Sequence, residues 1–261
     1  ALGSEPIPPS FNIGGVVVPT DVVQRKFSAE YRVVTESASP DRKRRVDPVL
    51  PGVSVGNVKV SAGTLGCVVY DAETGAPYAL SNWHVLHGPD GAIGDLVVQP
   101  GTHDDNRVDD NHMGTLVRSH LGVAGDCAVA SIEGRTFGRE VIELAVTVDE
   151  IGEPALDDKV IKSGRTTGVT HGIVTRIHTL TKVDYGGAIG VRDVGGFEIG
   201  PDPMHEPVDG EVSRGGDSGS VWLFKRPNGK PSRIMAGLHF AGEGPADPNE
   251  HAVACYPASV F

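Results

Sequence analysis

Short hydrophobic runs, separated by glycine, proline and polar turn residues, recur along the chain from Gly52 to its end. Apolar runs of about four to eight residues bounded by turn formers are typical of strands. The expected strands form one series at 65–70, 78–81, 96–99, 115–118 and 127–132, and a second at 159–162, 172–180, 196–199, 221–224, 234–240 and 252–256. Two series of about six strands predict an all-β protein of two tandem six-stranded antiparallel β-barrels, with a ligand cleft between them.

The first 50 residues lack this pattern and are expected to form an N-terminal arm. Prolines open the arm, and Thr20 and Asp21 predict the cap of a short helix that runs to residue 31. The polar stretch 37–45 ends in the basic run 42–45, for which a solvated linker is favoured over a processing or nuclear-targeting signal. The chain accordingly divides into an arm at 1–50, a first barrel at 51–140 and a second barrel at 141–261.

Composition supports strands and narrows the class of partner. The 261 residues include 35 glycines and 19 prolines, and the glycine share exceeds the roughly 7% of average proteins, which indicates many tight turns. The formal charge of −11 argues against binding to nucleic acid or to an anionic membrane. The expected partner is therefore a protein, peptide or small-molecule substrate.

No metal or cofactor is expected. The acidic loop 102–112 carries Asp104, Asp105, Asp109 and Asp110, and its polarity predicts a solvent-exposed loop. A cation could bind there, but the loop lacks the glycine bend and terminal glutamate of a calcium loop.

The three cysteines give no sign of a disulfide framework. Cys67, Cys127 and Cys255 cannot all pair, and each lies in an apolar run where a free thiol packs as a small hydrophobe. The apolar runs are too short to span a bilayer. A reducing, cytoplasmic setting is favoured, while the start at Ala1 leaves open a secreted protein whose leader has been removed.

A candidate nucleophile stands in the glycine-rich stretch 214–220, Arg-Gly-Gly-Asp-Ser-Gly-Ser. The glycines around Ser218 permit a sharp turn that exposes its hydroxyl and points the N–H groups of Gly216 and Ser218 at one spot. That arrangement would form an oxyanion hole. The alternative is an ordinary surface turn, because Gly, Asp and Ser are common turn formers.

A base and an orienting carboxylate are found upstream. His84 directly follows a predicted strand, and a histidine can face a serine and a carboxylate at once. Asp126 opens a predicted strand of small apolar residues, which favours a buried, fixed carboxylate. We therefore expect a triad of His84, Asp126 and Ser218, with the first two in one barrel and the serine in the other.

The His–Asp–Ser order along the chain distinguishes this triad from those of α/β-hydrolases and subtilisins. Together with Gly-Asp-Ser-Gly at 216–219, it resembles the chymotrypsin-like serine proteases over about residues 55–256. The Ser-Asn-Trp-His element at 81–84 matches that family more loosely. The resemblance implies the two-barrel fold and hydrolysis of peptide bonds through a covalent acyl-enzyme.

A second resemblance is local. Ser-Gly-Arg-Thr-Thr-Gly at 163–168 is similar to a stretch of bacterial members such as α-lytic protease and the streptogrisins. In those relatives a basic residue before Ser-Gly pairs with the aspartate that precedes the nucleophile, which carries over to Lys162 and Asp217. Lys162 stands where the relatives have arginine, so Arg165 is an alternative source of the charge. More weakly, the chain resembles intracellular trypsin-like peptidases of the narrow-leaf type, which implies a homo-oligomer.

Specificity is expected to come from Ser213 and from the strand around His239, Phe240, Ala241 and Gly242. This strand pairs with the substrate backbone in the family, and its Gly-Leu-His-Phe sequence resembles that of glutamyl endopeptidases. Ser213 and His239 can donate hydrogen bonds to an acidic or amide P1 side chain. The alternative is a buried structural His239 and a small apolar P1 residue.

The sequence thus favours a serine endopeptidase. Two alternatives remain open: a binding or scaffold module that keeps the fold without turnover, and an esterase of the same mechanism.

Overall fold

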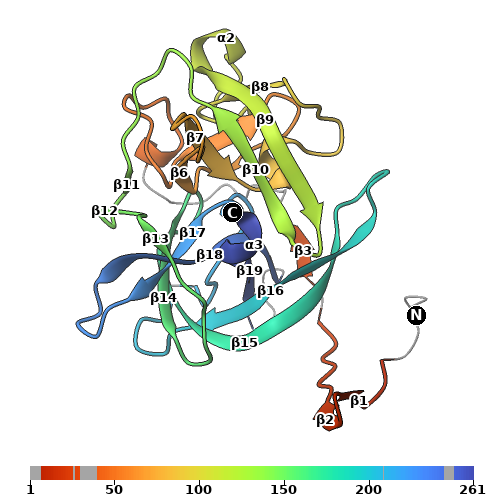
Figure 1. Ribbon diagram of the computed structural model, residues 1–261. Helices are drawn as coiled ribbons and strands as arrows, with labels where there is room; N and C mark the ends of the chain where they lie inside the picture. Colours follow the sequence, from red (N-terminus) through yellow and green to blue (C-terminus); the bar gives the residue numbers. More distant parts are fainter. Residues whose placement is uncertain (1–6, 26, 30–39, 208, 244–249) are drawn as a thin grey trace.

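The computed structural model describes residues 7–25, 27–29, 40–207, 209–243 and 250–261. Two curled β-sheets lie one above the other, and the strands of each wrap around their own core (Figure 1). The predicted all-β architecture of two barrels is confirmed. Its strands are more numerous than six in each barrel, because further short strands join both sheets.

The first sheet has seven strands in the order β5-β4-β8-β9-β10-β7-β6, all paired antiparallel. The predicted strand 65–70 is broken, because Leu65 and Gly66 leave the ladder between β5 and β6. The elements of this barrel are β4 (Ser54–Asn57), β5 (Gly63–Thr64), β6 (Cys67–Tyr70), β7 (Pro77–Ser81), α1 (Trp83–Leu86), β8 (Leu96–Val98), α2 (Val108–Asn111), β9 (His112–Gly122) and β10 (Gly125–Ser131).

The second sheet has eight strands, with the path β13-β18-β17-β14-β15-β16-β19 and a short strand β3 (Phe27–Ala29) that pairs with β15 and β18. Its other elements are β13 (Glu150–Ile151), β14 (Lys159–Gly164), β15 (Gly168–Asp184), β16 (Val191–Pro201), β17 (Val221–Lys225), β18 (Pro231–Glu243), β19 (Ala252–Cys255) and α3 (Pro257–Val260). Between the two barrels, β11 (Glu140–Val141) and β12 (Val146–Thr147) form a separate two-stranded sheet.

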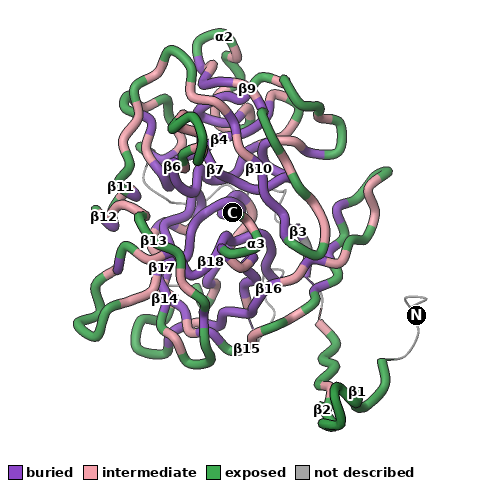
Figure 2. The backbone as a smooth tube through the Cα atoms, in the orientation of Figure 1, coloured by how far each residue is buried: buried purple, intermediate pink, exposed green. Residues whose placement is uncertain are grey.

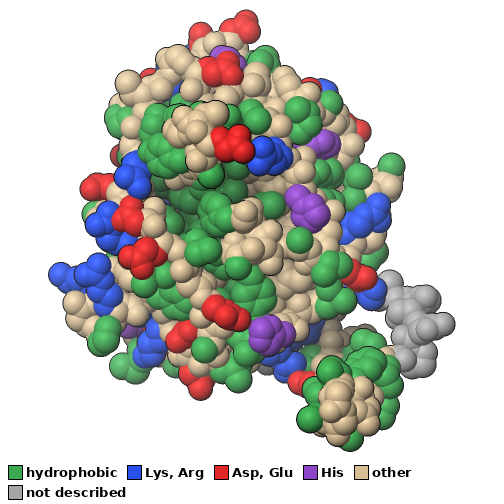
Figure 3. Space-filling view, viewed as in Figure 1, with side chains coloured by type: hydrophobic (Ala, Val, Ile, Leu, Met, Phe, Trp, Pro, Cys, Tyr) green, Lys and Arg blue, Asp and Glu red, His purple; other side chains and the backbone are tan. Residues whose placement is uncertain are grey.

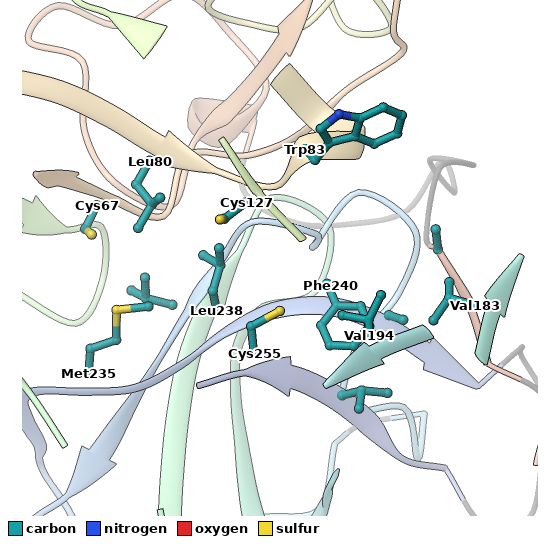
Figure 4. Packing of buried hydrophobic residues seen from close by; sticks show 14 of the residues in the cluster. Cys67, Leu80, Trp83, Cys127, Val183, Val194, Met235, Leu238, Phe240 and Cys255 are labelled. Atoms are coloured by element: carbon teal, nitrogen blue, oxygen red, sulfur yellow. The ribbon is translucent and has the colours of Figure 1, made fainter. Parts of the chain in front are cut away.

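Three hydrophobic clusters hold the molecule together. One fills the first barrel and one fills the second, as the buried tube segments of Figure 2 show. The third joins them: Leu80 and Cys127 of the first sheet face Leu238 and Cys255 of the second (Figure 4). Burying large apolar side chains stabilises by about 1.5–3 kcal/mol each. The seam between the barrels is therefore a packed core, and residues on its two sides are held in fixed positions.

The N-terminal arm differs from the prediction. β1 (Ser10–Ile13) and β2 (Val16–Pro19) form an exposed hairpin, and the expected helix from residue 20 is absent from the described residues 20–25 and 27–29. Thr20 does not cap a helix, because its N–H donates to the Pro9 carbonyl at 2.9 Å and closes the hairpin. The end predicted for that helix, residue 31, lies outside the described residues.

The prediction of a solvated linker at 37–45 is also wrong in part. Residues 37–39 lie outside the described residues, but Arg42, in a short 3-10 helix (Pro40–Arg42), is fully buried. Its guanidinium donates to the Ser163 hydroxyl at 2.8 Å and pairs with Glu143 at 3.0 Å. Arg44 and Arg45 are exposed, as expected. The basic run thus anchors the arm to the second barrel through one arginine.

Candidate active site

The base and carboxylate candidates meet at the seam between the barrels. α1 follows directly after β7, and β10 pairs with β7 antiparallel, which brings His84 beside Asp126. His84 Nδ1 lies 2.5 Å from Asp126 Oδ2, and the His84 backbone N–H donates to Oδ1 at 3.3 Å. The side chain of Asn82 donates to the Asp126 carbonyl at 2.7 Å, which fixes α1 against β10. Both predicted residues are therefore in direct contact.

Asp126 has a further partner that the sequence did not reveal. The hydroxyl of Tyr185 donates to Asp126 Oδ2 at 2.7 Å, and Tyr185 is buried. Tyr185 follows the last residue of β15, so the long β15–β16 hairpin of the second barrel carries it to a carboxylate of the first. The Asp126 N–H donates to the thiol sulfur of Cys255 at 3.3 Å. The carboxylate is thus held from both barrels.

Ser218 lies on the facing side of the same seam. Its carbonyl accepts a hydrogen bond from the Thr64 N–H at 2.7 Å. A Cβ on neighbouring Gly63 would fall 2.4 Å from Val85 and 2.9 Å from the Ser218 carbonyl oxygen, so glycine alone lets α1 and the serine loop approach this closely. The Ser218 hydroxyl lies 3.5 Å from the Phe240 carbonyl, at the outer limit of a hydrogen bond.

The two candidate oxyanion donors have defined orientations. The Gly215 carbonyl accepts from Thr166 Oγ1 at 2.8 Å, and the Asp217 carbonyl accepts from the Ser220 N–H at 3.0 Å. Within a planar trans peptide the C=O and N–H point in opposite directions. Hence the N–H groups of Gly216 and Ser218 are directed away from these contacts. Gly216 has φ of +100°, which only glycine adopts without strain.

The aspartate before the nucleophile sits in a cradle formed by residues 162–167. Lys162 Nζ donates to Asp217 Oδ2 at 2.9 Å, and both side chains are fully buried. The N–H groups of Thr166 and Thr167 donate to Oδ1 at 2.8 and 3.0 Å. The predicted pairing with Lys162 is therefore present in the structure, and these backbone donors were not foreseen.

Arg165 does not supply this charge. Its guanidinium pairs with Asp104 instead, and its Nε donates to Asp104 Oδ2 at 2.9 Å. Asp104 was expected to be solvated, but only 6% of its side chain is exposed. The side chain is shielded because Arg165 and the Ser54 hydroxyl, at 2.6 Å, satisfy its carboxylate. The expectation of an exposed loop holds for Asp109 and Asp110, which are exposed.

The balance of forces on Asp217 favours its charged form. Burial alone would raise the pKa of the Asp217 carboxyl, but the charge of Lys162 and hydrogen bonds from Thr167 and Lys162 lower it to about 2. A Cβ on Gly164 would lie 2.3 Å from Asp217 Oδ1, so the glycine of Ser-Gly-Arg-Thr-Thr-Gly is needed for this approach.

The candidate specificity residues are gathered behind the serine loop. His239 is fully buried, and its ring centroid lies 6.3 Å from that of Trp222. The backbone N–H of His239 donates to the Ser220 carbonyl at 2.9 Å. The Ser213 N–H donates to Glu250 Oε1 at 3.4 Å, which places a carboxylate next to the predicted pocket. The strand residues Phe240, Ala241 and Gly242 are all buried in β18.

The cysteines are buried free thiols, as predicted. Burial raises the pKa of Cys67 to about 12. Burial, with a smaller contribution from the charge of Asp126, raises the pKa of Cys127 to about 11. Among the described residues, no group of three or more His, Cys, Asp or Glu side chains has an arrangement that could hold a metal ion. The helices within the described ranges are all too short or too polar to cross a membrane.

Comparison with solved structures shows the fold. Protease A of Thermobifida fusca matches with a TM-score of 0.55 and 19% identity, over 80% of this chain and 91% of that one. A Nocardiopsis protease matches with a TM-score of 0.56 and 16% identity, over 80% and 92%. A glutamic acid-specific serine protease, described as using a histidine triad in substrate binding, matches at 0.55 and 18%, over 80% and 94%. No family model and no curated protein matches the chain. The chain therefore has the two-barrel fold of chymotrypsin-like serine proteases.

Proposed function

We propose that the protein is a serine endopeptidase in which His84, Asp126 and Ser218 form the catalytic triad. The main support is the contact of His84 Nδ1 with Asp126 at 2.5 Å, in a seam that the loop of Ser218 also enters. A carboxylate on Nδ1 fixes the ring so that Nε2 is on the side away from Asp126. That nitrogen is the atom that takes the serine proton.

The chemistry proceeds in two stages. The Ser218 hydroxyl turns from the Phe240 carbonyl toward His84, loses its proton to Nε2 and attacks the substrate carbonyl. The N–H groups of Gly216 and Ser218 stabilise the negative oxygen, and Asp126 stabilises the imidazolium. His84 then protonates the leaving amine, and an acyl-enzyme remains. Water, deprotonated by His84, hydrolyses this ester and restores the serine.

The substrate backbone is proposed to pair with β18 at Phe240, Ala241 and Gly242, with the P1 side chain directed toward Ser213 and His239. The two donors favour an acidic or amide P1 residue. The similar glutamic acid-specific protease is described as using a histidine triad in substrate binding, whereas His239 here faces Trp222, and Glu250 lies beside Ser213. The negative charge of Glu250 would repel an acidic P1 side chain, so a small apolar P1 residue is the competing specificity.

One observation favours a different function, a binding module without turnover. Only 1% of the surface of either His84 or Ser218 is exposed, so a peptide cannot reach them in this conformation. Buried His84 and Ser218 side chains are expected both for an enzyme in a closed state and for a module without catalysis. The two differ in whether exposing these side chains leads to substrate hydrolysis.

A fluorophosphonate probe tests the nucleophile. We expect the probe to label the wild type and the matched control Ser220→Ala, and not Ser218→Ala, with equal circular dichroism for all three. Hydrolysis of a mixed peptide library, with ester substrates alongside, then separates endopeptidase from esterase and maps the P1 residue. Labelling of Ser218→Ala at the wild-type rate would remove Ser218 from its role.

A further inference from the structure

The N-terminal arm occupies the edge of β18. β3 pairs antiparallel with it, with Phe27 opposite Glu243, Ser28 opposite Gly242 and Ala29 opposite Ala241. Figure 1 shows β3 at the junction of the two barrels. An extended peptide that binds an exposed sheet edge uses the same backbone groups. The arm therefore sits on the strand to which the proposed function assigns the substrate.

The arm is fixed there on both sides and along its length. Ser28 also pairs with Asp184 of β15, so β3 lies between two strands of the second barrel. Phe27 and Ala29 are buried, at 9% and 7% exposure, in the cluster that joins the barrels. Burial of an aromatic side chain contributes much more than an exposed contact. This is the packing of an integrated strand.

Two ion pairs extend the contact beyond β3. Arg25 pairs with Glu243 at 3.1 Å, and only 2% of the Glu243 side chain is exposed. Glu243 also lies 3.2 Å from the ring of His251. Further along the arm, Asp21 pairs with Arg176 of β15 at 3.0 Å. The Arg25 pair is the stronger of the two, because surface ion pairs such as that of Asp21 contribute little.

We propose that residues 21–25 and 27–29 of the arm act as an internal, substrate-like segment that occupies the substrate edge of β18 and restrains the peptidase until the arm is displaced. The proposal rests on the proposed function of the same site. The arm is paired up to Ala241, next to Phe240, whose carbonyl lies 3.5 Å from the Ser218 hydroxyl, and both His84 and Ser218 are 1% exposed. The proposal also gives the arm a function, although each barrel has a core of its own without it.

The test uses substitutions in the full chain that weaken the docked strand. Ser28→Pro removes an N–H from the middle of β3, and proline is tolerated poorly inside a paired strand. Arg25→Glu places a like charge beside Glu243. The matched control is Val17→Pro in the exposed hairpin, where Val17 is 66% exposed and β2, among the described strands, pairs with β1 alone.

Two readouts are measured on each variant. Hydrogen exchange at the Gly242 amide reports whether the arm leaves β18. The Glu243 N–H donates to the His251 carbonyl at 3.1 Å, so the neighbouring Gly242 N–H points to the other side of the strand, toward Ser28. Peptide kcat/KM with fluorophosphonate labelling reports on catalysis. We expect the Gly242 amide to exchange at least tenfold faster in Ser28→Pro and Arg25→Glu, and kcat/KM to rise at least tenfold in both. Val17→Pro should leave both values at those of the wild type.

The outcomes separate the two proposals. If exchange is faster in Ser28→Pro and Arg25→Glu while turnover and labelling stay at the wild-type level, the arm does not restrain the enzyme. The proposed endopeptidase function would then be unaffected. Unchanged exchange in both arm variants would overturn the docking itself. Faster exchange with no labelling or turnover in any variant would overturn the proposed peptidase, and with it the restraint. Faster exchange with higher turnover supports both.

Discussion

The hydroxyl of Tyr185 helps to fix the position of the Asp126 carboxylate. It donates to Asp126 Oδ2 at 2.7 Å, the same oxygen that contacts His84. Hydrogen bonds to charged groups contribute about 1.5–3 kcal/mol. Tyr185→Phe keeps the ring and removes the donor. We expect kcat to fall about tenfold, which corresponds to about 1.4 kcal/mol, with KM nearly unchanged.

The split between kcat and KM distinguishes positioning from a merely structural role. The matched control is Tyr256→Phe, which removes a hydroxyl that accepts from the His178 N–H at 2.7 Å. Steady-state kinetics and thermal unfolding are measured on both variants. A fall in melting temperature for Tyr185→Phe with kcat unchanged would assign Tyr185 to the fold alone.

Asp217 and Lys162 form a buried pair whose loss should be costly. Removing one partner of such a pair leaves an unpaired buried charge and costs about 3–5 kcal/mol. We expect Asp217→Asn to lose about this much stability in urea unfolding, and Asp217→Asn with Lys162→Met to recover part of it. A double variant less stable than the sum of its single changes would contradict this account.

The same pair sets an acid limit. The pKa of Asp217 is lowered to about 2 in the fold, against about 3.9 for an unfolded aspartate. A depressed carboxyl pKa stabilises the fold above the unfolded value, and this contribution is lost as pH falls through the folded value. Wild-type stability should therefore fall between about pH 4 and pH 2. Asp217→Asn should show a shallower slope there in pH-dependent urea unfolding.

The residues of the site differ in how visible they are in sequence. Ser218, His84 and Asp126 could be named because chain order and flanking glycines or strand ends restrict the choice. Tyr185 could not, since its contact depends on the length and twist of a hairpin. Sequence could not distinguish Lys162 from Arg165 as the partner of Asp217, because both are basic and the pairing of Arg165 with Asp104 is a long-range contact.

At the scale of elements, the glycine turn of the nucleophile is also a contact between barrels. Gly219 has φ of +92°, and a Cβ there would lie 2.0 Å from Ser81 Oγ and 2.3 Å from the Thr64 carbonyl oxygen. Gly229 has a similar φ of +79° but open space around it. Substitution of Gly229 therefore introduces the same backbone strain as substitution of Gly219, without a steric clash, and serves as the matched control.

We expect Gly229→Ala to destabilise by about 1–2 kcal/mol, the cost of a left-handed conformation for a non-glycine residue. Gly219→Ala should lose that amount and roughly 1–3 kcal/mol more for overpacking. Urea unfolding of the two variants gives the difference. Equal losses would show that the serine loop and the first barrel are not packed as tightly as the structure has them.

Most strands could be predicted because apolar runs bounded by turn formers give a strong local signal. The predicted strand 115–118 extends to β9 (His112–Gly122), and 172–180 extends to β15 (Gly168–Asp184). The extensions were missed because polar residues fill the exposed positions of both long strands. The helix from Thr20 was wrong because a hairpin contact competed with the cap. β3 is a strand only because it pairs with the distant strands β15 and β18, so the local sequence pattern could not predict it.

At the scale of the whole molecule, the arm combines a docked strand with an exposed apolar hairpin. Figure 3 shows hydrophobic side chains gathered on the hairpin, where Ile13, Val16 and Val17 are 65%, 64% and 66% exposed. The docked strand is buried in the seam. The two parts of the arm thus differ in their surroundings: β3 is paired with β15 and β18, and the hairpin is exposed to solvent.

The register of β3 indicates which bond of the arm is open to attack once the groove becomes active. A substrate strand that follows this register, with its residues opposite Gly242 and Ala241, brings its next residue opposite Phe240, beside Ser218. In the sequence of the arm, the residue after Ala29 is Glu30, followed by Tyr31. Glu30 lies outside the described residues. An acidic residue there matches the donors proposed for the P1 pocket.

We therefore expect slow self-cleavage between Glu30 and Tyr31. Intact-mass measurement during incubation should reveal a product that begins at Tyr31, formed by wild type and absent from Ser218→Ala. Because the arm is part of the same chain, the fraction cut per hour should not depend on protein concentration. Glu30→Lys should slow the cut at least tenfold while a peptide substrate is hydrolysed at the rate of the wild type. A first cut elsewhere in the arm, with Glu30–Tyr31 intact, would show that β3 is held in a register different from that of a substrate.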